Sequence, residues 1–279
     1  MKPKCIVMLS GGLDSRLAIK IMQEQGFDVL ALFFNLPFGT GCCDQKCSFN
    51  FSQMQGVKLK IFDCSQGKLL EEYLDVIRKA DHGRGSGIDP CIDCRIFILK
   101  KAKKFAEENK IKFIATGEVL NERPMSQNAK AMKIIENESN LKEKLIRPLC
   151  EIGISGRRRD KQIELAKKFK ISYPNPGGGC LLCEKELKDK IKTVLDKKVP
   201  EYYAGLVNVG RHFENSKIIL GRNLKENEIL KIQKGIKIIP KQPGATALVI
   251  NKKFEKKAKE LIQKYSKKKI VEFENVLSV

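Results

Sequence analysis

The chain has 279 residues, 42% of them hydrophobic, which is enough for one large domain and a smaller one. No apolar run approaches the length of a membrane span, and the first residues lack the apolar stretch and cleavage site of a signal peptide. We therefore expect a soluble, cytoplasmic protein that does not bind membranes. The formal net charge of +21 suits a polyanionic partner such as RNA, although lysine-rich proteins carry similar charge without one.

The first half of the chain alternates short apolar runs with amphipathic segments. The runs predict strands, and the helical spacing of Leu17, Ile21 and Met22 predicts a helix that ends at Gly26. This alternation predicts an α/β fold, a Rossmann-like parallel sheet with helices on both faces and ligands beyond the carboxyl ends of the strands. We expect strands at 4–9, 29–34, 57–62, 113–116 and 144–147, and helices at 13–26, 69–79 and 96–109.

The pattern changes after residue 149, where short strands begin to mix with basic helices. We predict a larger domain over 1–189 and a smaller α+β domain over 190–279. The second domain carries 21 Lys/Arg against 9 Asp/Glu, a net of +12, which makes it the better candidate for binding RNA. The elements expected here are helices at 154–170, 187–198, 224–233 and 254–265, a Gly- and Pro-rich loop at 173–179, and strands at 204–209, 216–220 and 246–250.

The string Ser10-Gly11-Gly12-Leu13-Asp14-Ser15 lies directly between a predicted strand and a predicted helix. Consecutive glycines let backbone N–H groups approach an anion, and the helix N-terminus adds its unsatisfied donors. The serine hydroxyls can bind phosphate oxygens, and Asp14 can hold a divalent ion that bridges them. The lysine of a Walker-type loop is absent, so the string is not a Walker-type site. An ordinary capped turn is the alternative.

Ten cysteines in a cytosolic chain indicate metal, cluster or sulfur chemistry rather than disulfides. Cys91 and Cys94 form a C-x-x-C at the start of a predicted helix, where the helix N-terminus and Arg95 favour thiolate. Cys180 and Cys183 form a second pair far along the chain, so a four-cysteine zinc site is open.

A third group of thiols, Cys42, Cys43 and Cys47, follows the second predicted strand and so lies on the ligand-binding rim. These cysteines could relay sulfur, but bystander thiols are the favoured interpretation. His82 and His212 are the only two histidines, and we assign neither a catalytic role.

Several of these strings together carry a resemblance to a known family. Ser10 to Ser15 resembles the signature of the PP-loop ATPases, which split ATP between the α and β phosphates and adenylate a carbonyl oxygen. Other segments resemble the thiouridine synthase-like branch of that superfamily, related to 4-thiouridine synthases and 2-thiouridylases. These segments are Gly87 to Arg95, Thr116 to Leu120, Arg123 to Gln127, Gly156 to Arg159 and Gly178 to Leu182.

The resemblance implies an ATP-dependent tRNA sulfurtransferase that adenylates a uridine (or cytidine) carbonyl oxygen and replaces it with sulfur. It implies ATP over Ser10, Gly11, Gly12, Asp14, Ser15 and Gly117, with Mg²⁺ near Asp14. It implies a 4Fe–4S cluster on Cys91, Cys94 and Cys180, with zinc as the alternative; Asp14, Cys94 and Cys180 are the expected catalytic residues. Three cysteines leave one iron of the cluster without a protein ligand, free to bind sulfide. Cys183 departs from the family pattern and, as a fourth ligand, would occupy that iron.

The partners implied are tRNA and a sulfur donor, either inorganic sulfide or a cysteine desulfurase system, and a homodimer is a candidate assembly. The second domain resembles a domain of the NFACT RNA-binding proteins through Gly221-Arg222-Asn223, Glu226-Asn227 and Pro243 to Thr246. Its candidate phosphate contacts are Arg211, Arg222, Lys225 and Lys241, with a solvated basic face as the alternative. Two rival functions stay open: a PP-loop ligase or amidotransferase with zinc, and a non-catalytic RNA-binding nucleotide sensor.

Overall fold

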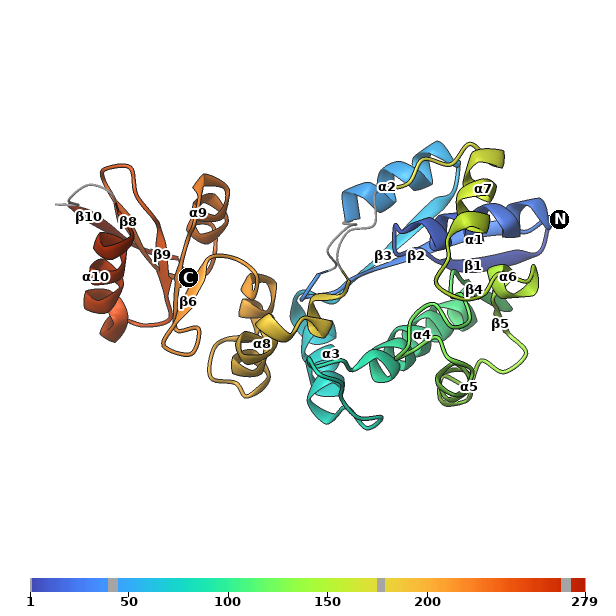
Figure 1. Ribbon diagram of the computed structural model, residues 1–279, viewed down its shortest axis with the longest axis horizontal. Helices are drawn as coiled ribbons and strands as arrows, with labels where there is room; N and C mark the ends of the chain where they lie inside the picture. Colours follow the sequence, from blue (N-terminus) through green and yellow to red (C-terminus); the bar gives the residue numbers. More distant parts are fainter. Residues whose placement is uncertain (1, 40–44, 175–178, 267–271, 279) are drawn as a thin grey trace. The chain divides into compact units, whose positions relative to one another are not determined.

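The protein is described by a computed structural model that covers residues 2–39, 45–174, 179–266 and 272–278 (Figure 1). The chain divides into two compact units, Met1–Lys185 and Glu186–Val279. Each unit has its own sheet and its own hydrophobic core.

The larger unit is built on a five-stranded, wholly parallel sheet with the order β3-β2-β1-β4-β5. The central strand β1 is buried on both faces, and its Val7 lies between Ala31 of β2 and Ala115 of β4. Burial on both faces explains why the central strand is a continuous apolar run, whereas the edge strand Lys58–Asp63 contains two lysines and is only partly buried. The strands are β1 (Lys4–Met8), β2 (Asp28–Asn35), β3 (Lys58–Asp63), β4 (Phe113–Thr116) and β5 (Leu145–Ile146).

Helices cover both faces of this sheet (Figure 1), so the predicted Rossmann-like fold is confirmed. Each helix buries an apolar stripe, as α3 does with Leu70, Tyr73, Leu74 and Ile77. One face carries α1 (Leu13–Glu24), α2 (Gln45–Met54), α6 (Pro148–Glu151) and α7 (Asp160–Lys168), and the other α3 (Gly67–Lys79), α4 (Cys91–Glu108) and α5 (Ala129–Glu138).

The strand order reverses at β1. The chain runs from β1 outward to β2 and β3, and then returns to place β4 on the other side of β1. Connections that leave neighbouring strands in opposite directions open a crevice at their carboxyl ends. This crevice lies at the loops that follow β1 and β4, and it places the candidate site there.

The helix predicted at 154–170 is shorter in the structure, because α7 begins only at Asp160. Gly156 adopts a left-handed conformation with φ of 84°, and Ser155 forms a bridge to Leu120, so the chain turns before the helix starts. The helices α2 and α5 were not predicted; both have short apolar stripes interrupted by serine or charged residues.

The smaller unit contains an antiparallel five-stranded sheet with the order β10-β8-β9-β7-β6, against which α10 packs. The predicted smaller α+β fold is therefore confirmed. Its elements are α8 (Lys188–Leu195), β6 (Arg211–Phe213), β7 (Ile218–Leu220), α9 (Leu224–Lys231), β8 (Gly235–Pro240), β9 (Ala247–Val249), α10 (Glu255–Tyr265) and β10 (Phe273–Ser278).

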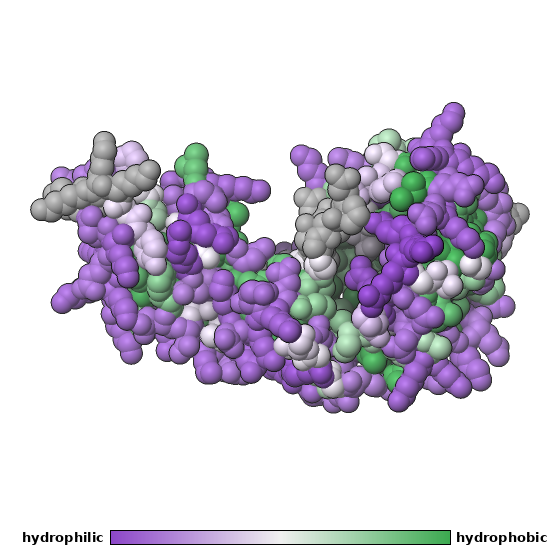
Figure 2. Space-filling model, viewed as in Figure 1, coloured by the Kyte–Doolittle hydropathy of each residue, from purple (hydrophilic) through white to green (hydrophobic). Residues whose placement is uncertain are grey.

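The strand predicted at 204–209 is wrong. Glu201–Leu206 is a 3₁₀ helix that begins after Pro200, whose carbonyl oxygen accepts from Tyr203 N at 3.0 Å. The buried side chains of Tyr203 and Leu206 are three residues apart, which is the period of a 3₁₀ turn. The face of this unit that Figure 2 shows is largely hydrophilic. Within the parts of the chain that the structure describes, no helix has both the length and the apolar character needed to cross a membrane.

Candidate active site

The Ser10–Ser15 string forms a tight anion-binding loop between β1 and α1. Gly11 has a φ of 84°, which only glycine adopts readily, and Gly12 is the N-cap of α1. Ser15 Oγ donates to Gly12 O at 2.9 Å, and Ser10 Oγ lies 3.3 Å from Ser15 Oγ. The serines and the helix N-terminus thus face one point at the carboxyl end of β1, where a phosphate group can bind.

A buried arginine, Arg16, holds this loop from behind. Its Nε donates to Gly11 O at 2.7 Å, and its Nη1 donates to Ser172 O at 2.6 Å. Its Nη2 lies 2.9 Å from Cys47 Sγ, and the guanidinium stacks over Phe51 at 4.7 Å from the ring centroid. Cys47 therefore lies behind the loop, while Cys42 and Cys43 lie outside the described residues. Sequence reasoning did not single out Arg16, although a cation next to the motif was visible.

Gly117, at the end of β4, lies directly against the loop. A Cβ at this position would lie 2.5 Å from Ser15 N and 2.6 Å from Asp14 C. These are backbone atoms that cannot move without distorting the start of α1. Only glycine therefore allows β4 and the loop to form the two sides of the crevice.

The Asp14 carboxylate lies in this crevice with an incomplete set of partners. Its Oδ1 is buried and has no hydrogen-bond partner among the described residues. Burial raises the pKa of the Asp14 carboxyl, although the guanidinium groups of Arg159 and Arg123 act to lower it. Burial, together with the nearby charge of Asp14, also raises the pKa of Glu122. A buried carboxylate oxygen beside a phosphate loop is suited to binding a divalent cation.

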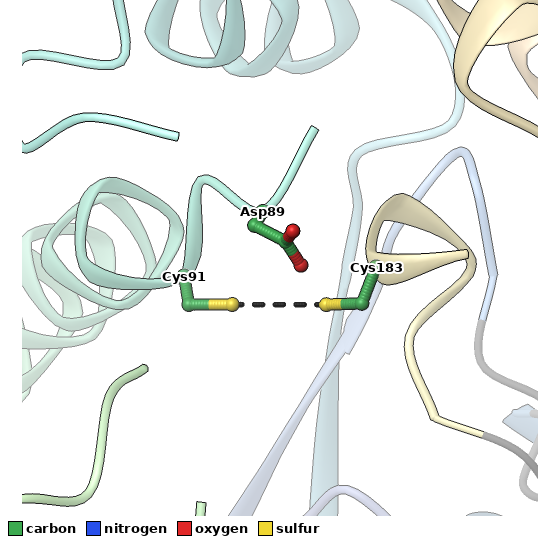
Figure 3. Close-up of side chains that lie close together, drawn as sticks. All are labelled: Asp89, Cys91 and Cys183. Carbon is green, nitrogen blue, oxygen red and sulfur yellow. Dashed lines mark hydrogen bonds between the residues drawn. The ribbon is translucent and has the colours of Figure 1, made fainter. Parts of the chain in front are cut away.

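The two C-x-x-C pairs meet across the end of the sheet. Cys91 begins α4, and its Sγ lies 3.8 Å from Cys183 Sγ (Figure 3). Cys94 Sγ lies 3.4 Å from the hydroxyl of Tyr73. The short 3₁₀ turn Leu181–Cys183 is fixed by its own backbone, because Leu182 O accepts from Ile88 N at 2.9 Å and from Asp89 N at 3.1 Å.

Hydrogen bonds among these thiols decide where a negative charge lies. Hydrogen bonding from Cys180 and Cys91 lowers the pKa of the Cys183 thiol to about 2. The same contact with Cys183 raises the pKa of Cys91, and burial raises the pKa of Cys94. These hydrogen bonds favour a thiolate at Cys183, which the sequence analysis kept as a fourth ligand beside the three implied cluster ligands.

One cavity of about 390 Å³ joins the phosphate loop to the cysteines. Arg123 lines it, and its charge acts to lower the pKa of both Asp14 and Cys183. Arg95 also lines it and is held by the buried Glu118, whose Oε1 lies 3.5 Å from Arg95 Nε. The expected site residues in its wall are Ser10, Gly12, Asp14, Ser15, Gly117, Cys91, Cys94, Cys180 and Cys183.

The four basic residues predicted to contact RNA lie in the smaller unit and differ in their partners. Arg222 binds the Glu226 carboxylate, with 2.9 Å between Nε and Oε1, and Lys241 pairs with Glu272 at 2.7 Å. Arg211 stacks on Tyr265 at 4.7 Å from the ring centroid. Lys225 is exposed on α9 and has no ion pair among the described residues. Two of the four charges are therefore already partly neutralised.

Both histidines are held by hydrogen bonds to neighbouring groups. His212 is held by Ser216 Oγ and by the carbonyl oxygens of Leu206 and Val209, and burial lowers its pKa to about 4. His82 lies between Asp93 and Glu138, at 2.8 Å and 2.7 Å.

The strand order, the loop after β1 and the orphaned carboxylate define a nucleotide-binding protein of the PP-loop ATPase class. More narrowly, the chain belongs to the family described as thiamine biosynthesis protein (ThiI), whose family model matches residues 1–199.

Known proteins similar to this chain include tRNA-thiolating enzymes. A tRNA-specific 2-thiouridylase MnmA of Karelsulcia muelleri (strain GWSS) is 29% identical over 231 residues, covering 76% of this chain and 58% of the relative. A probable tRNA sulfurtransferase of Mycoplasma genitalium is 29% identical over 168 residues, covering 60% of this chain and 40% of the relative. The chain spans about half the length of the curated relatives it matches.

Two further proteins are similar to parts of this chain. An argininosuccinate synthase of Geobacillus sp. (strain WCH70) is 28% identical over 180 residues, covering 62% of this chain and 40% of the relative. A solved 4-thiouridine synthetase–RNA complex with bound ATP matches with a TM-score of 0.48 at 20% identity, covering 73% of this chain and 53% of that chain.

Proposed function

We propose that this protein is an ATP-dependent tRNA sulfurtransferase. It would adenylate a uridine (or cytidine) carbonyl oxygen in tRNA and then replace that oxygen with sulfur. The observation that carries the proposal is the single cavity lined by both the phosphate loop and the cysteines. Activation of an oxygen and delivery of sulfur to the same carbon require both sets of groups around one substrate.

The loop supplies the first half of the reaction. ATP would lie over Ser10–Ser15, with Mg²⁺ at the unpartnered oxygen of Asp14. The base carbonyl oxygen attacks the α-phosphorus and pyrophosphate leaves, so that AMP rather than oxide becomes the leaving group. The protein contributes positioning and positive charge, from the N-terminus of α1 and from Arg123 at the cavity wall.

The cysteines supply the second half. A persulfide on Cys94 or Cys180 would attack the activated carbon, and the carbon–oxygen bond to AMP breaks. A neighbouring thiolate then cleaves the sulfur–sulfur bond, which leaves the thiocarbonyl on the base and a disulfide for an external thiol to reduce. A cysteine desulfurase system would supply the persulfide sulfur, whereas inorganic sulfide would attack the activated carbon directly, displace AMP and leave no disulfide.

The cysteine set also suits a thiolate-held metal group. Cys91, Cys94 and Cys180 line the same cavity as free thiols, and thiolates are the ligands of iron–sulfur clusters and of zinc. A 4Fe–4S cluster on these three residues, with one iron not bound by protein, would supply sulfide directly in place of a persulfide.

The assignment is tested by products. The protein is incubated without oxygen with ATP, Mg²⁺, bulk tRNA and sulfide, the tRNA is digested, and the nucleosides are measured by mass spectrometry. We expect AMP, pyrophosphate and a nucleoside heavier by the replacement of oxygen with sulfur. Formation of ADP and phosphate, or unchanged nucleosides together with AMP, would exclude the assignment.

A second candidate function rests on the similarity to argininosuccinate synthase. In that case a small-molecule carbonyl would be adenylated and attacked by an amine, with the cysteines holding a structural zinc ion. ATP turnover that is independent of tRNA but stimulated by a carboxylate metabolite and ammonia would favour it. The basic smaller unit, proposed here as an RNA-binding domain over 190–279, argues for the first candidate.

A further inference from the structure

We infer that Asp89, Cys91 and Cys183 together bind one zinc-type divalent ion. Cys94 and Cys180 lie outside this group of mutually close ligand atoms and are left to carry sulfur, so the inference selects the persulfide route over a cluster on Cys91, Cys94 and Cys180. Only that role of Cys94 and Cys180 rests on the proposed function; the metal site stands on its own geometry.

The first argument is the distance between the two sulfurs. Zinc–thiolate bonds are about 2.3 Å long, so a tetrahedral ion holds two thiolate sulfurs about 3.8 Å apart. Cys91 Sγ and Cys183 Sγ lie 3.8 Å apart. Thiolates that bind different irons of a cluster lie farther apart, because an iron–iron edge separates them. The pair therefore matches one metal ion.

The second argument is the third ligand. One atom from each of Asp89, Cys91 and Cys183 lies within 4.8 Å of the other two. Figure 3 shows the Asp89 carboxylate directed into the space between the two sulfurs. Two thiolates and one carboxylate are accepted zinc ligands, and a three-ligand site leaves a fourth position for water or substrate.

The third argument is that the backbone holds these groups together in advance. Gly87 lies so close to the Leu181–Cys183 turn that a Cβ on it would lie 2.9 Å from Leu182 O. Asp89 has a φ of 46°, an uncommon conformation for a residue with a side chain, and its Oδ2 accepts from Gly87 N at 2.7 Å. The 3₁₀ turn and the loop before α4 are thereby fixed face to face.

The fourth argument is charge. Asp89 is only 7% exposed, and two groups that become anionic as thiolates lie next to it. Converging anions in a buried space are costly unless a cation is bound among them. Cys94, by contrast, has the hydroxyl of Tyr73 as its neighbour at 3.4 Å, and a phenol is not a ligand of this kind of centre.

The experiment measures metal in the full-length protein purified without oxygen. We expect about one zinc per chain, as one set of ligands predicts, and no visible colour. Cys91→Ser and Cys183→Ser should lose the zinc, and Asp89→Asn should weaken the affinity for added Zn²⁺ by at least about tenfold. Cys94→Ser, Cys180→Ser and the control Cys150→Ser, which changes a thiol outside the cavity wall, should each keep it.

A second measurement works on the unchanged protein and so does not depend on whether variants fold. Replacing the metal with Co²⁺ gives a sulfur-to-cobalt absorption band whose intensity counts the thiolates, and we expect two. A brown protein whose iron survives Cys183→Ser but not Cys94→Ser, or a cobalt band of three or four thiolates, would overturn the inference. Failure to thiolate tRNA while zinc binds as described would count against the proposed function alone.

Discussion

Asp14, the proposed magnesium ligand, shows how a residue of the candidate site can destabilise the fold that holds it. Burial raises the pKa of this carboxyl above its usual value, so the folded state binds its proton more tightly than the unfolded state does. The charged form therefore works against folding at neutral pH, and the penalty grows as the pH rises above the unfolded pKa. Its Oδ1 has no hydrogen-bond partner among the described residues, which supports the proposal that a cation binds there.

Asp14→Asn is therefore expected to lower pyrophosphate formation at least about 100-fold, because the carboxylate proposed to bind Mg²⁺ beside the phosphates is lost. The same change should leave the melting temperature at pH 7 equal or higher, because it removes a buried charge. Thermal unfolding and pyrophosphate release measured on one preparation test both parts. A variant that is inactive because it melts far below the wild type would contradict this account of Asp14.

At His82 we expect folding stability to depend on pH through a charged form that favours the folded state. Its contact with Asp93, helped by Glu138, raises the pKa of His82 above its usual 6.5. A raised histidine pKa contributes stability that is fully present below pH 6.5 and is lost as the pH rises through the folded-state pKa. We expect His82→Gln to lower the melting temperature by a few degrees at pH 6 and by less at pH 9. An equal difference at both pH values would show that the ion pairs add nothing.

At the scale of elements, the close approach of β4 to the loop depends on one missing side chain. Gly117→Ala places a methyl group against backbone atoms of Asp14 and Ser15, and overpacking of this kind costs about 2 kcal/mol. We expect lower stability and at least about tenfold weaker ATP binding, since the start of α1 must move. Gly179→Ala is the matched control: it lies in the same cavity wall with open space around it, and should change neither quantity.

The elements that the sequence predicts well are those whose pattern is fixed by burial on two faces. The central parallel strands are continuous apolar runs, and α1 and α3 lie within two residues of their predicted bounds, whereas α4 begins at Cys91, five residues before its predicted start. The region 204–209 failed because its buried residues suit a strand and a 3₁₀ turn equally. The strands β6, β8 and β10 were missed, since short antiparallel strands gain their stability from partners distant in sequence.

The residues of the candidate site likewise fall into those that the sequence could predict and those that it could not. The phosphate loop and the two cysteine pairs could be predicted, because motif spacing and strand order place them at one end of the sheet. Arg16, Glu122 and the carboxylate of Asp89 could not, because their roles depend on contacts made only after folding. The partner of Cys91 is such a case: spacing alone gave no reason to prefer Cys183 over Cys180.

At the scale of the whole molecule, the net charge of +21 does not by itself say which basic residues can bind a phosphate, because some of them already pair with acidic neighbours. In the smaller unit, acidic neighbours already bind Arg222 and Lys241, so their release to a phosphate costs an existing ion pair. Arg211 is held flat on Tyr265, and Lys225 is exposed on α9, so both can meet a phosphate at little cost. Affinity for RNA should therefore be unequally divided among the four.

The last prediction follows from that division. Each phosphate neutralised by a basic side chain adds about 0.9 to the slope of log K against log salt for a duplex, and about 0.7 for a single strand. If Arg211 and Lys225 each contact one phosphate of tRNA, the double variant Arg211→Ala with Lys225→Ala should reduce the slope by about 1.5. Lys241→Ala, which removes a charge already paired with Glu272, should change it by much less. Binding of full-length protein to tRNA, measured across a salt series, tests this. An unchanged slope in the double variant would mean that this face of the smaller unit does not bind the RNA backbone.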